Sequence, residues 1–224
     1  RCRDSCRGSR RVTPKSRWSR ARQPTGTRAT AKLIAGAVKR DLFHGGQIVF
    51  DGGPVRFRTP RAAVKQGIAY VTEDRKADGF FETMSIGENI HMNWMAADLN
   101  PKAIVRASDA AKIGAEWVNA LNIKAISAAA KVIELSGGNQ QKVVIARALV
   151  QTPRVVIFDE PTRGVDVGAI ADVHRIINEL ADRGIAVVVI CSYLPEIMSL
   201  SDRILVTRQG RVVEEFSAED AEDE

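Results

Sequence analysis

The sequence of 224 residues predicts an α/β fold with a mainly parallel sheet, a small antiparallel β portion and a helical subdomain. Short β-type runs alternate with helix-length segments, which implies parallel strands joined by helical crossovers. Two of the runs, 155–158 and 185–191, are apolar throughout, as in strands buried on both faces of a sheet. An Asp-Gly-Gly-Pro stretch at 51–54 favours a hairpin turn and therefore an antiparallel pair.

The same signals place the elements in chain order. The expected strands are residues 47–50, 55–58, 68–71, 155–158, 185–191, 204–206 and 212–216. The expected helices are residues 86–97, 108–121, 138–150 and 169–183. Arg183 and Gly184 close the last helix with a cation and a glycine stop. Residues 80–135 form the predicted helical subdomain.

Residues 1–30 form a predicted disordered basic arm. The chain has 33 Lys+Arg and 27 Asp+Glu, yet residues 1–40 hold 13 of the basic side chains and one acid, which leaves the remainder at −6. The arm has no helical or strand periodicity, so it cannot bury enough surface to offset its ordering entropy. Three interpretations stay open: an arm for nucleic acid or anionic lipid, a transit peptide, or a stretch produced by a wrong start or shifted reading frame.

The remaining composition excludes several classes of protein. No apolar run reaches the roughly 18 residues that a membrane-spanning helix needs. Three cysteines, Cys2, Cys6 and Cys191, cannot all pair within the chain, which favours a reduced, cytosolic setting. Seven of the last eleven residues are acidic, so 217–224 are expected to be a solvated acidic tail.

Paired carboxylates end the apolar strand at 155–158. Asp159 and Glu160 would lie at the carboxyl edge of a parallel sheet, where open α/β folds bind ligands. One carboxylate there can hold Mg²⁺ and the next can orient a water for phosphoryl transfer. Taken alone, the pattern also fits a strand that simply ends in a turn.

Two glycine-containing segments flank this strand. Leu-Ser-Gly-Gly-Asn-Gln-Gln-Lys at 135–142 starts a helix, with Ser136 as the expected N-cap and glycines that let an anion approach the backbone N–H groups. Thr-Arg-Gly-Val-Asp-Val-Gly at 162–168 leads into the next helix through Asp166. An ordinary linker and a surface loop are the alternatives for these segments.

Together these segments resemble the ATPases of the ATP-binding-cassette (ABC) family. Residues 135–142 look like the signature motif, 155–160 the Walker B strand and 164–166 the D-loop. With GIAYVTEDRKADGFF and MSIGENI upstream, the spellings are similar to the second of two tandem cassettes in bacterial importers of ribose, galactose and xylose type. The similarity covers residues 31–216, and it implies a P-loop NTPase-like ABC cassette.

The resemblance implies a role for each matched residue. Asp159 would hold Mg²⁺ and Glu160 would polarise the hydrolytic water. Ser136 and Gly138 would contact the γ-phosphate of an ATP held by an opposite cassette. The implied ATP-binding residues are Ser136, Gly137, Gly138, Asn139, Gln140, Glu73, Asp166 and Ser192. Among them, Glu73 occupies the position at which the family has a glutamine that senses the membrane subunit, and Asp166 would couple the two sites. Separately, residues 80–120 would dock on the membrane subunit.

Two departures from the family limit the expected activity. Residues 21–30 contain one glycine, Gly26, and no GxxxxGK[ST] phosphate loop, although Arg28 supplies a charge. Ser192 occupies the position at which the family has its switch histidine. The nearest histidine, His174, is expected at the surface. The chain is therefore expected to hydrolyse no ATP alone and to lend its signature motif to a composite site.

The predicted function is that of a partial ATPase subunit of a carbohydrate importer, with ATP and Mg²⁺ as cofactors. Expected partners are the membrane permease subunits and a second cassette, and a periplasmic sugar-binding protein only indirectly; the expected location is the cytoplasmic face of the membrane. The alternatives are a catalytically dead remnant and a non-transport ABC module that binds nucleic acid or ribosomes through its arm. The arm has a single aromatic residue, Trp18, to stack on bases, so nucleic acid is not the favoured partner.

Overall fold

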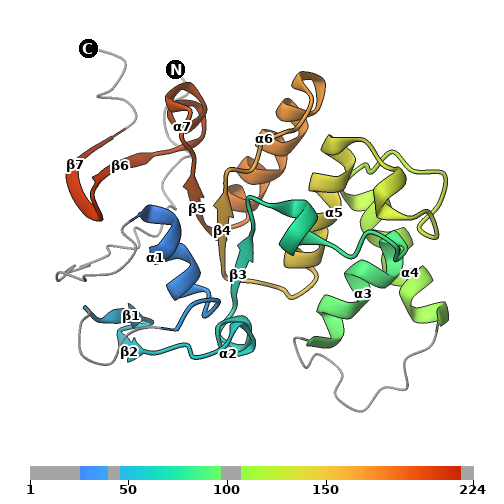
Figure 1. The fold of residues 1–224 in the computed structure, drawn as a ribbon, viewed down its shortest axis with the longest axis horizontal. Coiled ribbons are helices and arrows are strands. Elements are labelled where there is room, and N and C mark those ends of the chain that lie inside the picture. Colours follow the sequence, from blue (N-terminus) through green and yellow to red (C-terminus); the bar gives the residue numbers. More distant parts are fainter. Residues whose placement is uncertain (1–25, 40–45, 97–106, 218–224) are drawn as a thin grey trace, which may run out of the picture.

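A three-stranded parallel sheet forms the centre of the molecule. The computed structural model describes residues 26–39, 46–96 and 107–217. Its sheet has the order β3 (Ile68–Val71), β4 (Val155–Asp159) and β5 (Ala186–Ile190), as Figure 1 shows. Register pairs Tyr70 with Ile157 and Ile157 with Val188. The predicted parallel sheet is confirmed, with strand bounds within one residue of those expected.

Helices cover both faces of this sheet. They are α1 (Thr27–Ile34), α2 (Pro60–Lys65), α5 (Gly137–Leu149) and α6 (Val167–Asp182). On one face Ile68 and Ile157 pack with Ala31 of α1. On the other face Val156 and Phe158 belong to the larger core that α5 and α6 complete. Alternate residues of β4 therefore enter two separate cores, as the period of a strand requires.

Two antiparallel hairpins complete the β structure. β1 (Ile48–Phe50) pairs with β2 (Gly53–Val55), and β6 (Arg203–Arg208) pairs with β7 (Arg211–Ser217). The first turn is shorter than the predicted 51–54, because Asp51 and Gly52 both adopt positive φ (52° and 78°) and close a two-residue turn. The second strand consequently begins at residue 53 rather than 55.

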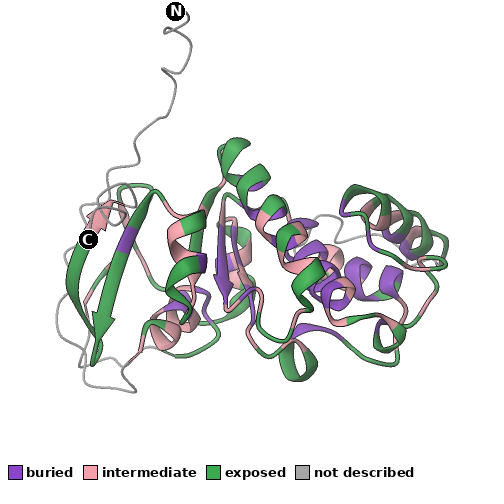
Figure 2. Ribbon diagram, turned by 90° about the horizontal axis from the view of Figure 1, so that it is seen from above, coloured by how far each residue is buried: buried purple, intermediate pink, exposed green. Residues whose placement is uncertain are grey.

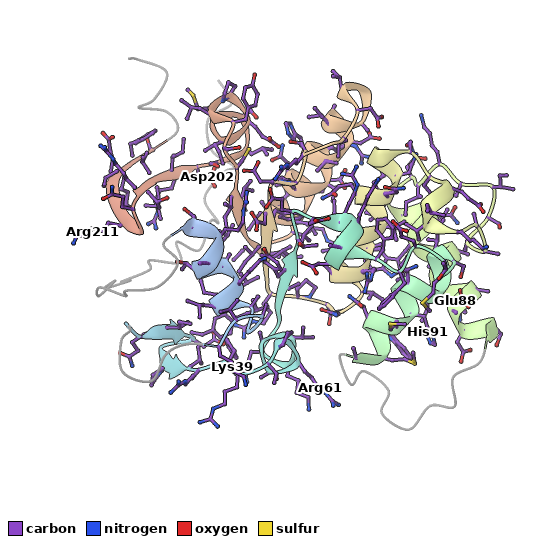
Figure 3. The ribbon with its side chains drawn as sticks, in the orientation of Figure 1. Lys39, Arg61, Glu88, His91, Asp202 and Arg211 are labelled. Atoms are coloured by element: carbon purple, nitrogen blue, oxygen red, sulfur yellow. The ribbon has the colours of Figure 1, made fainter. Side chains whose placement is uncertain are left out.

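The helical part of the chain contains α3 (Ile86–Ala96), α4 (Ala107–Ala120) and two short turns. These turns are η1 (Arg75–Gly79) and η2 (Val132–Glu134). α3 begins with a capping box: the Glu88 carboxylate accepts from the backbone N–H and the hydroxyl of Ser85, and the Ser85 hydroxyl accepts from the Glu88 N–H. These bonds lower the pKa of Glu88. His91, labelled with Glu88 in Figure 3, is buried and stacks on Trp94.

The ends of the described chain differ from the predicted boundaries. The predicted disordered arm was drawn to residue 30, but Thr27–Thr30 form the first turn of α1, so that boundary is wrong; residues 1–25 lie outside the described residues. Of the acidic tail, only Ser217 is described, and it ends β7. α7 (Leu194–Leu200) was not expected. In the part of the chain that the structure describes, no helix is both long and apolar enough to cross a membrane.

Candidate functional site

Three carboxylates gather at the carboxyl end of the parallel sheet. Asp159 is the last residue of β4, Glu160 follows it, and Glu73 lies two residues beyond the end of β3. All three are largely or wholly buried, and the Asp159 side chain is 0% exposed. We call Glu73, Asp159 and Glu160 the carboxylate triad. Adjacent parallel strands bring it together, because their carboxyl ends meet at one edge of the sheet.

The guanidinium of Arg28 lies at the centre of the carboxylate triad. Its Nε donates to Asp159 Oδ1 at 3.1 Å, its Nη2 to Glu160 Oε1 at 3.3 Å, and its Nη1 lies 2.5 Å from Glu73 Oε2. Arg28 is the second residue of α1, which the sequence placed in the disordered arm. In the sequence it is one of many basic side chains of this stretch, noted only as a charge near the missing phosphate loop.

Tyr70 and Arg163 complete the surroundings of the carboxylate triad. The Tyr70 hydroxyl donates to Asp159 Oδ2 at 2.5 Å, and the guanidinium of Arg163 forms an ion pair with Glu73 Oε1. Burial and the bond to Asp159 raise the pKa of Tyr70, so this phenol stays protonated as a donor. Neither residue was identified from the sequence, because their partners lie far away along the chain.

Glu160 has an unusual backbone. Its φ is 50°, in the left-handed region that side chains other than Gly and Asn seldom adopt, and its N–H donates to Ile190 O at 2.7 Å. Such conformations cost roughly 1–3 kcal/mol and are found preferentially at functional sites. The bond to the end of β5 holds this turn in place.

The carboxylate triad in this arrangement does not fit a magnesium ion. Mg²⁺ needs oxygens that converge at about 2.0–2.1 Å in octahedral geometry. Here both oxygens of Asp159, both of Glu73 and Oε1 of Glu160 face Arg28, Arg163 or the Tyr70 hydroxyl. Among the described residues, no three His, Cys, Asp or Glu side chains are grouped so as to hold a metal ion.

The second candidate site is the N-terminus of α5. Ser136 is exposed at the N-cap position, as predicted, but its side chain caps no helix N–H. Its hydroxyl instead accepts from Asn139 Nδ2 at 2.9 Å, and Asn139 Oδ1 accepts from the Lys124 N–H at 2.8 Å. The side-chain amide of buried Gln140 donates to Leu135 O at 3.1 Å. The first turn of α5 is thus fixed in place without side-chain capping by Ser136.

The two glycines of this turn are needed for close packing on Gly164 and on Ala169 in the first turn of α6. A Cβ on Gly138 would lie 2.3 Å from the Cβ of Ala169, and a Cβ on Gly137 would lie 2.8 Å from Gly164 O. Asp166 carboxylate oxygens lie near both positions, at 3.7 Å from the same hypothetical atoms. The structure therefore brings Asp166 together with the 136–140 segment, and it gives both glycines a packing role.

Arg75 connects the two candidate sites. Its Nη1 and Nη2 donate to the carbonyls of Arg163 and Gly164 at 2.8 and 2.6 Å, and its Nε donates to Gln140 Oε1 at 3.4 Å. Arg163 in turn reaches Glu73 of the carboxylate triad. No role for Arg75 is predicted from the sequence, because nothing in its local pattern shows contacts so distant along the chain.

Lys142, which ends the 135–142 segment, has a structural place. It is buried, and its Nζ donates to Asp172 Oδ2 at 2.6 Å and to Asn122 O at 3.0 Å. The bond from Lys142 lowers the pKa of Asp172. This pair joins α5 to α6.

The positions after β5 are arranged differently from the expectation. Ser192 is exposed just beyond the end of β5. His174 was expected at the surface, but this prediction is wrong: its side chain is 24% exposed and its Nε2 lies 3.0 Å from Glu196 Oε1. Buried Glu196 also accepts from the Thr162 hydroxyl at 2.7 Å and from the Cys191 thiol at 3.1 Å. Glu196 thus fixes the loop that follows Glu160.

Comparison with known proteins identifies the family to which this arrangement belongs. The family profile described as "ABC transporter" matches residues 25–163, which is more than half of the chain. The chain belongs to the ABC transporter family. Membership implies ATP as the ligand of this ABC cassette, typically with Mg²⁺.

Individual relatives agree with this assignment. The cassette is 46% identical over 170 residues to the ribose import ATP-binding protein RbsA of Geobacillus kaustophilus, which covers 76% of this chain and 34% of the relative. It is 43% identical over 180 residues to the xylose import ATP-binding protein XylG of Thermoanaerobacter pseudethanolicus, which covers 80% of this chain and 35% of the relative. The chain therefore spans about a third of the length of these relatives.

Solved structures confirm the predicted ABC fold. The ATP-binding cassette MJ1267 of an ABC transporter matches with a TM-score of 0.73 at 23% identity, covering 88% of this chain and 79% of that one. A dimeric post-hydrolysis state of the cassette MJ0796, bound to ADP and Pi, matches with a TM-score of 0.69 at 20% identity, covering 85% and 80%. At these identities the likeness establishes the fold.

Proposed function

We propose that this chain is part of the ATPase subunit of a carbohydrate importer and that it donates the N-terminus of α5 to an ATP held by a second cassette. One observation carries the proposal: exposed Ser136 stands at the start of α5 without capping it. The residues offered to the nucleotide are Ser136, Gly137, Gly138, Asn139 and Gln140, with Asp166 beside them.

The physical basis is anion binding at a helix N-terminus. The first N–H groups of a helix have no partner within it, and the aligned peptide dipoles leave a partial positive charge there. A phosphate that arrives from outside meets these N–H groups and the Ser136 hydroxyl. Because Asn139 and Gln140 hold the first turn in place, the donors need no rearrangement on binding.

The chain's own carboxylate triad supports a donor role rather than autonomous hydrolysis. The oxygens of Asp159 and Glu160 that would serve a nucleotide site face Arg28. The metal-ligand role of Asp159 and the water-polarising role of Glu160 therefore belong to a state in which Arg28 has moved away. We expect the purified chain alone to show negligible ATP turnover.

The proposed setting follows from the names of the relatives, which are ribose and xylose import ATP-binding proteins. Sugar import is accordingly the process proposed for this chain, with ATP hydrolysis as its driving force. Its partners would be the membrane permease subunits, docked through residues 80–120 and sensed through Glu73, and a second cassette. Ser192 would contribute to the nucleotide site from the position of the switch histidine. The location would be the cytoplasmic face of the membrane, and the sugar-binding protein would be only an indirect partner. The nucleic-acid alternative depends on residues 1–25, which lie outside the described residues, and is not proposed.

An amide NMR titration tests the donor role on the chain alone. With EDTA present, millimolar ATP should shift the signals of Gly137, Gly138 and Asn139. Ser136→Glu should weaken this response at least about tenfold, because it places a negative charge where the phosphate binds.

Ser127→Glu is the matched control. Ser127 is also exposed and its hydroxyl accepts one backbone N–H, from Ala129, but it stands at no α-helix N-terminus. It should leave the ATP response unchanged. The proposal is wrong if the α5 amides do not respond to ATP, or if both variants weaken the response equally.

A further inference from the structure

We propose that the Arg28 guanidinium is a built-in counter-cation that occupies the carboxylate triad and keeps divalent cations out of it. The three guanidinium nitrogens face three different carboxylates, those of Glu73, Asp159 and Glu160, at 2.5 to 3.3 Å. One side chain of this chain thereby takes the position in which a metal ion would neutralise the same oxygens. This inference does not depend on the proposed import function.

Charge balance explains why a cation is required at this position. Bringing three carboxylates into a largely buried cluster costs several kcal/mol per unpaired charge unless a cation matches them. Arg28 and Arg163 supply two positive charges against the three negative ones. With its planar fork of donors, arginine can bond several carboxylates at once, whereas lysine presents a single point charge.

Helix α1 places Arg28 in the carboxylate triad. Ala31, one turn further along the helix, is buried against Ile68 and Ile157 of the sheet. At the start of the helix, the hydroxyls of Thr27 and Thr207 lie 2.5 Å apart. Since the helix is packed on the sheet, Arg28 is present at a high effective concentration, and a dissolved cation must compete with it.

The side chain can nevertheless leave. Arg28 is 43% exposed, while Asp159 beneath it is not exposed at all. Rotation of the arginine into solvent requires no change in the sheet, and it would uncover one oxygen of each carboxylate. The site is therefore closed by one movable side chain.

Binding of Mn²⁺, followed by electron paramagnetic resonance on the full chain, tests this inference without any nucleotide. The wild-type chain should bind Mn²⁺ weakly. Arg28→Gln should bind one Mn²⁺ at least about tenfold more tightly, because the tethered positive charge is gone. Adding Asp159→Asn to Arg28→Gln should abolish the gain.

Lys32→Gln is the matched control, since it removes one positive charge from the same helix outside the carboxylate triad. It should bind Mn²⁺ like the wild type. Arg28→Lys should give an intermediate affinity, because lysine keeps the charge but cannot span three carboxylates.

A thermal melt with and without Mn²⁺ covers the case in which Arg28→Gln is unstable. If three unpaired carboxylates destabilise the fold, Mn²⁺ should raise the melting temperature of Arg28→Gln and leave that of the wild type unchanged. The inference is overturned if Arg28→Gln gains no Mn²⁺ affinity over Lys32→Gln and no stabilisation by Mn²⁺. It is equally overturned if the wild-type chain binds Mn²⁺ tightly through Asp159.

Discussion

The strands β4 and β5 are neighbours in one sheet and almost equally apolar, yet they are buried to different degrees. Val156 and Phe158 of β4 are fully buried in the core that α5 and α6 complete, whereas Val188 of β5 is 46% exposed. The hairpin of β6 and β7 continues this trend, with exposed Leu205 and Val213. Figure 2 shows the contrast: buried residues concentrate in the sheet and in the helices beside it, while the hairpin is mostly exposed.

The number of neighbouring elements explains the difference. β4 has a strand on each side and a helix on each face, whereas β5 pairs with β4 alone among the strands that the structure describes. Val188 lies on the face that α1 covers, but α1 has only eight residues and packs over Ile68 and Ile157. Apolar composition therefore predicts that a segment is a strand; the neighbouring elements decide how much stability it contributes.

The largest expected effect is in the well-packed region. Ile145→Ala in α5 should lower the free energy of unfolding by about 2–5 kcal/mol, because Ile145 is wholly buried and the truncation leaves a cavity. Urea unfolding followed by far-ultraviolet circular dichroism measures it. A loss below about 0.5 kcal/mol would show that this core is loosely packed and would remove the contrast between the two regions.

The reactivity of Cys191 tests how firmly the end of β5 is closed. Burial raises the pKa of the Cys191 thiol to about 12, from an ordinary value of 9.0, and its bond to Glu196 acts in the same direction. At pH 8 the thiolate is thus roughly 1000-fold rarer than for an ordinary thiol, and the higher nucleophilicity of a more basic thiolate recovers part of that loss. We expect alkylation to be about 30-fold slower than in the unfolded chain.

Iodoacetamide labelling, with the Cys191 peptide followed by mass spectrometry, measures this rate, and the same chain in urea is the reference. Because burial raises the pKa of the folded thiol to about 12, its rate should keep rising with pH after the rate of the unfolded reference has levelled off. A folded rate that levels off together with that of the reference would show that the end of β5 opens and exposes an ordinary thiol.

The sequence predicted the elements that carry a clear local pattern, and the exposed β7 was predicted as closely as the buried α5. α5, α6 and β4 differ by at most two residues from their expected bounds, because apolar periodicity, breaks and the Gly184 stop all point to the same boundaries. α2 was missed, although Thr59 and Pro60 form an ordinary N-cap and first-turn pair. The first turn of α1 had no apolar signal, since Thr27 and Arg28 bond to residues far along the chain.

The candidate site divides in the same way. Asp159 and Glu160 form one short segment of the sequence, and Ser136 to Gln140 form another. Each segment is contiguous, so its pattern could be recognised. Arg28, Tyr70 and Arg75 act through partners more than 60 residues away, at separations of 131, 89 and 65 positions. Only the fold shows such contacts, and they determine whether the carboxylate triad is open or closed.

The smallest expected effect lies in the exposed hairpin. Val213→Thr in β7 keeps a β-branched side chain and replaces one methyl group by a hydroxyl, and Val213 is already 56% exposed. The free energy of unfolding should therefore change by less than about 0.5 kcal/mol, measured in the same urea titration as Ile145→Ala. A loss comparable to that of Ile145→Ala would mean that the hairpin is covered in solution. The contrast between the two regions would then describe where this chain meets another surface, and the stability of β5 to β7 would depend on that contact.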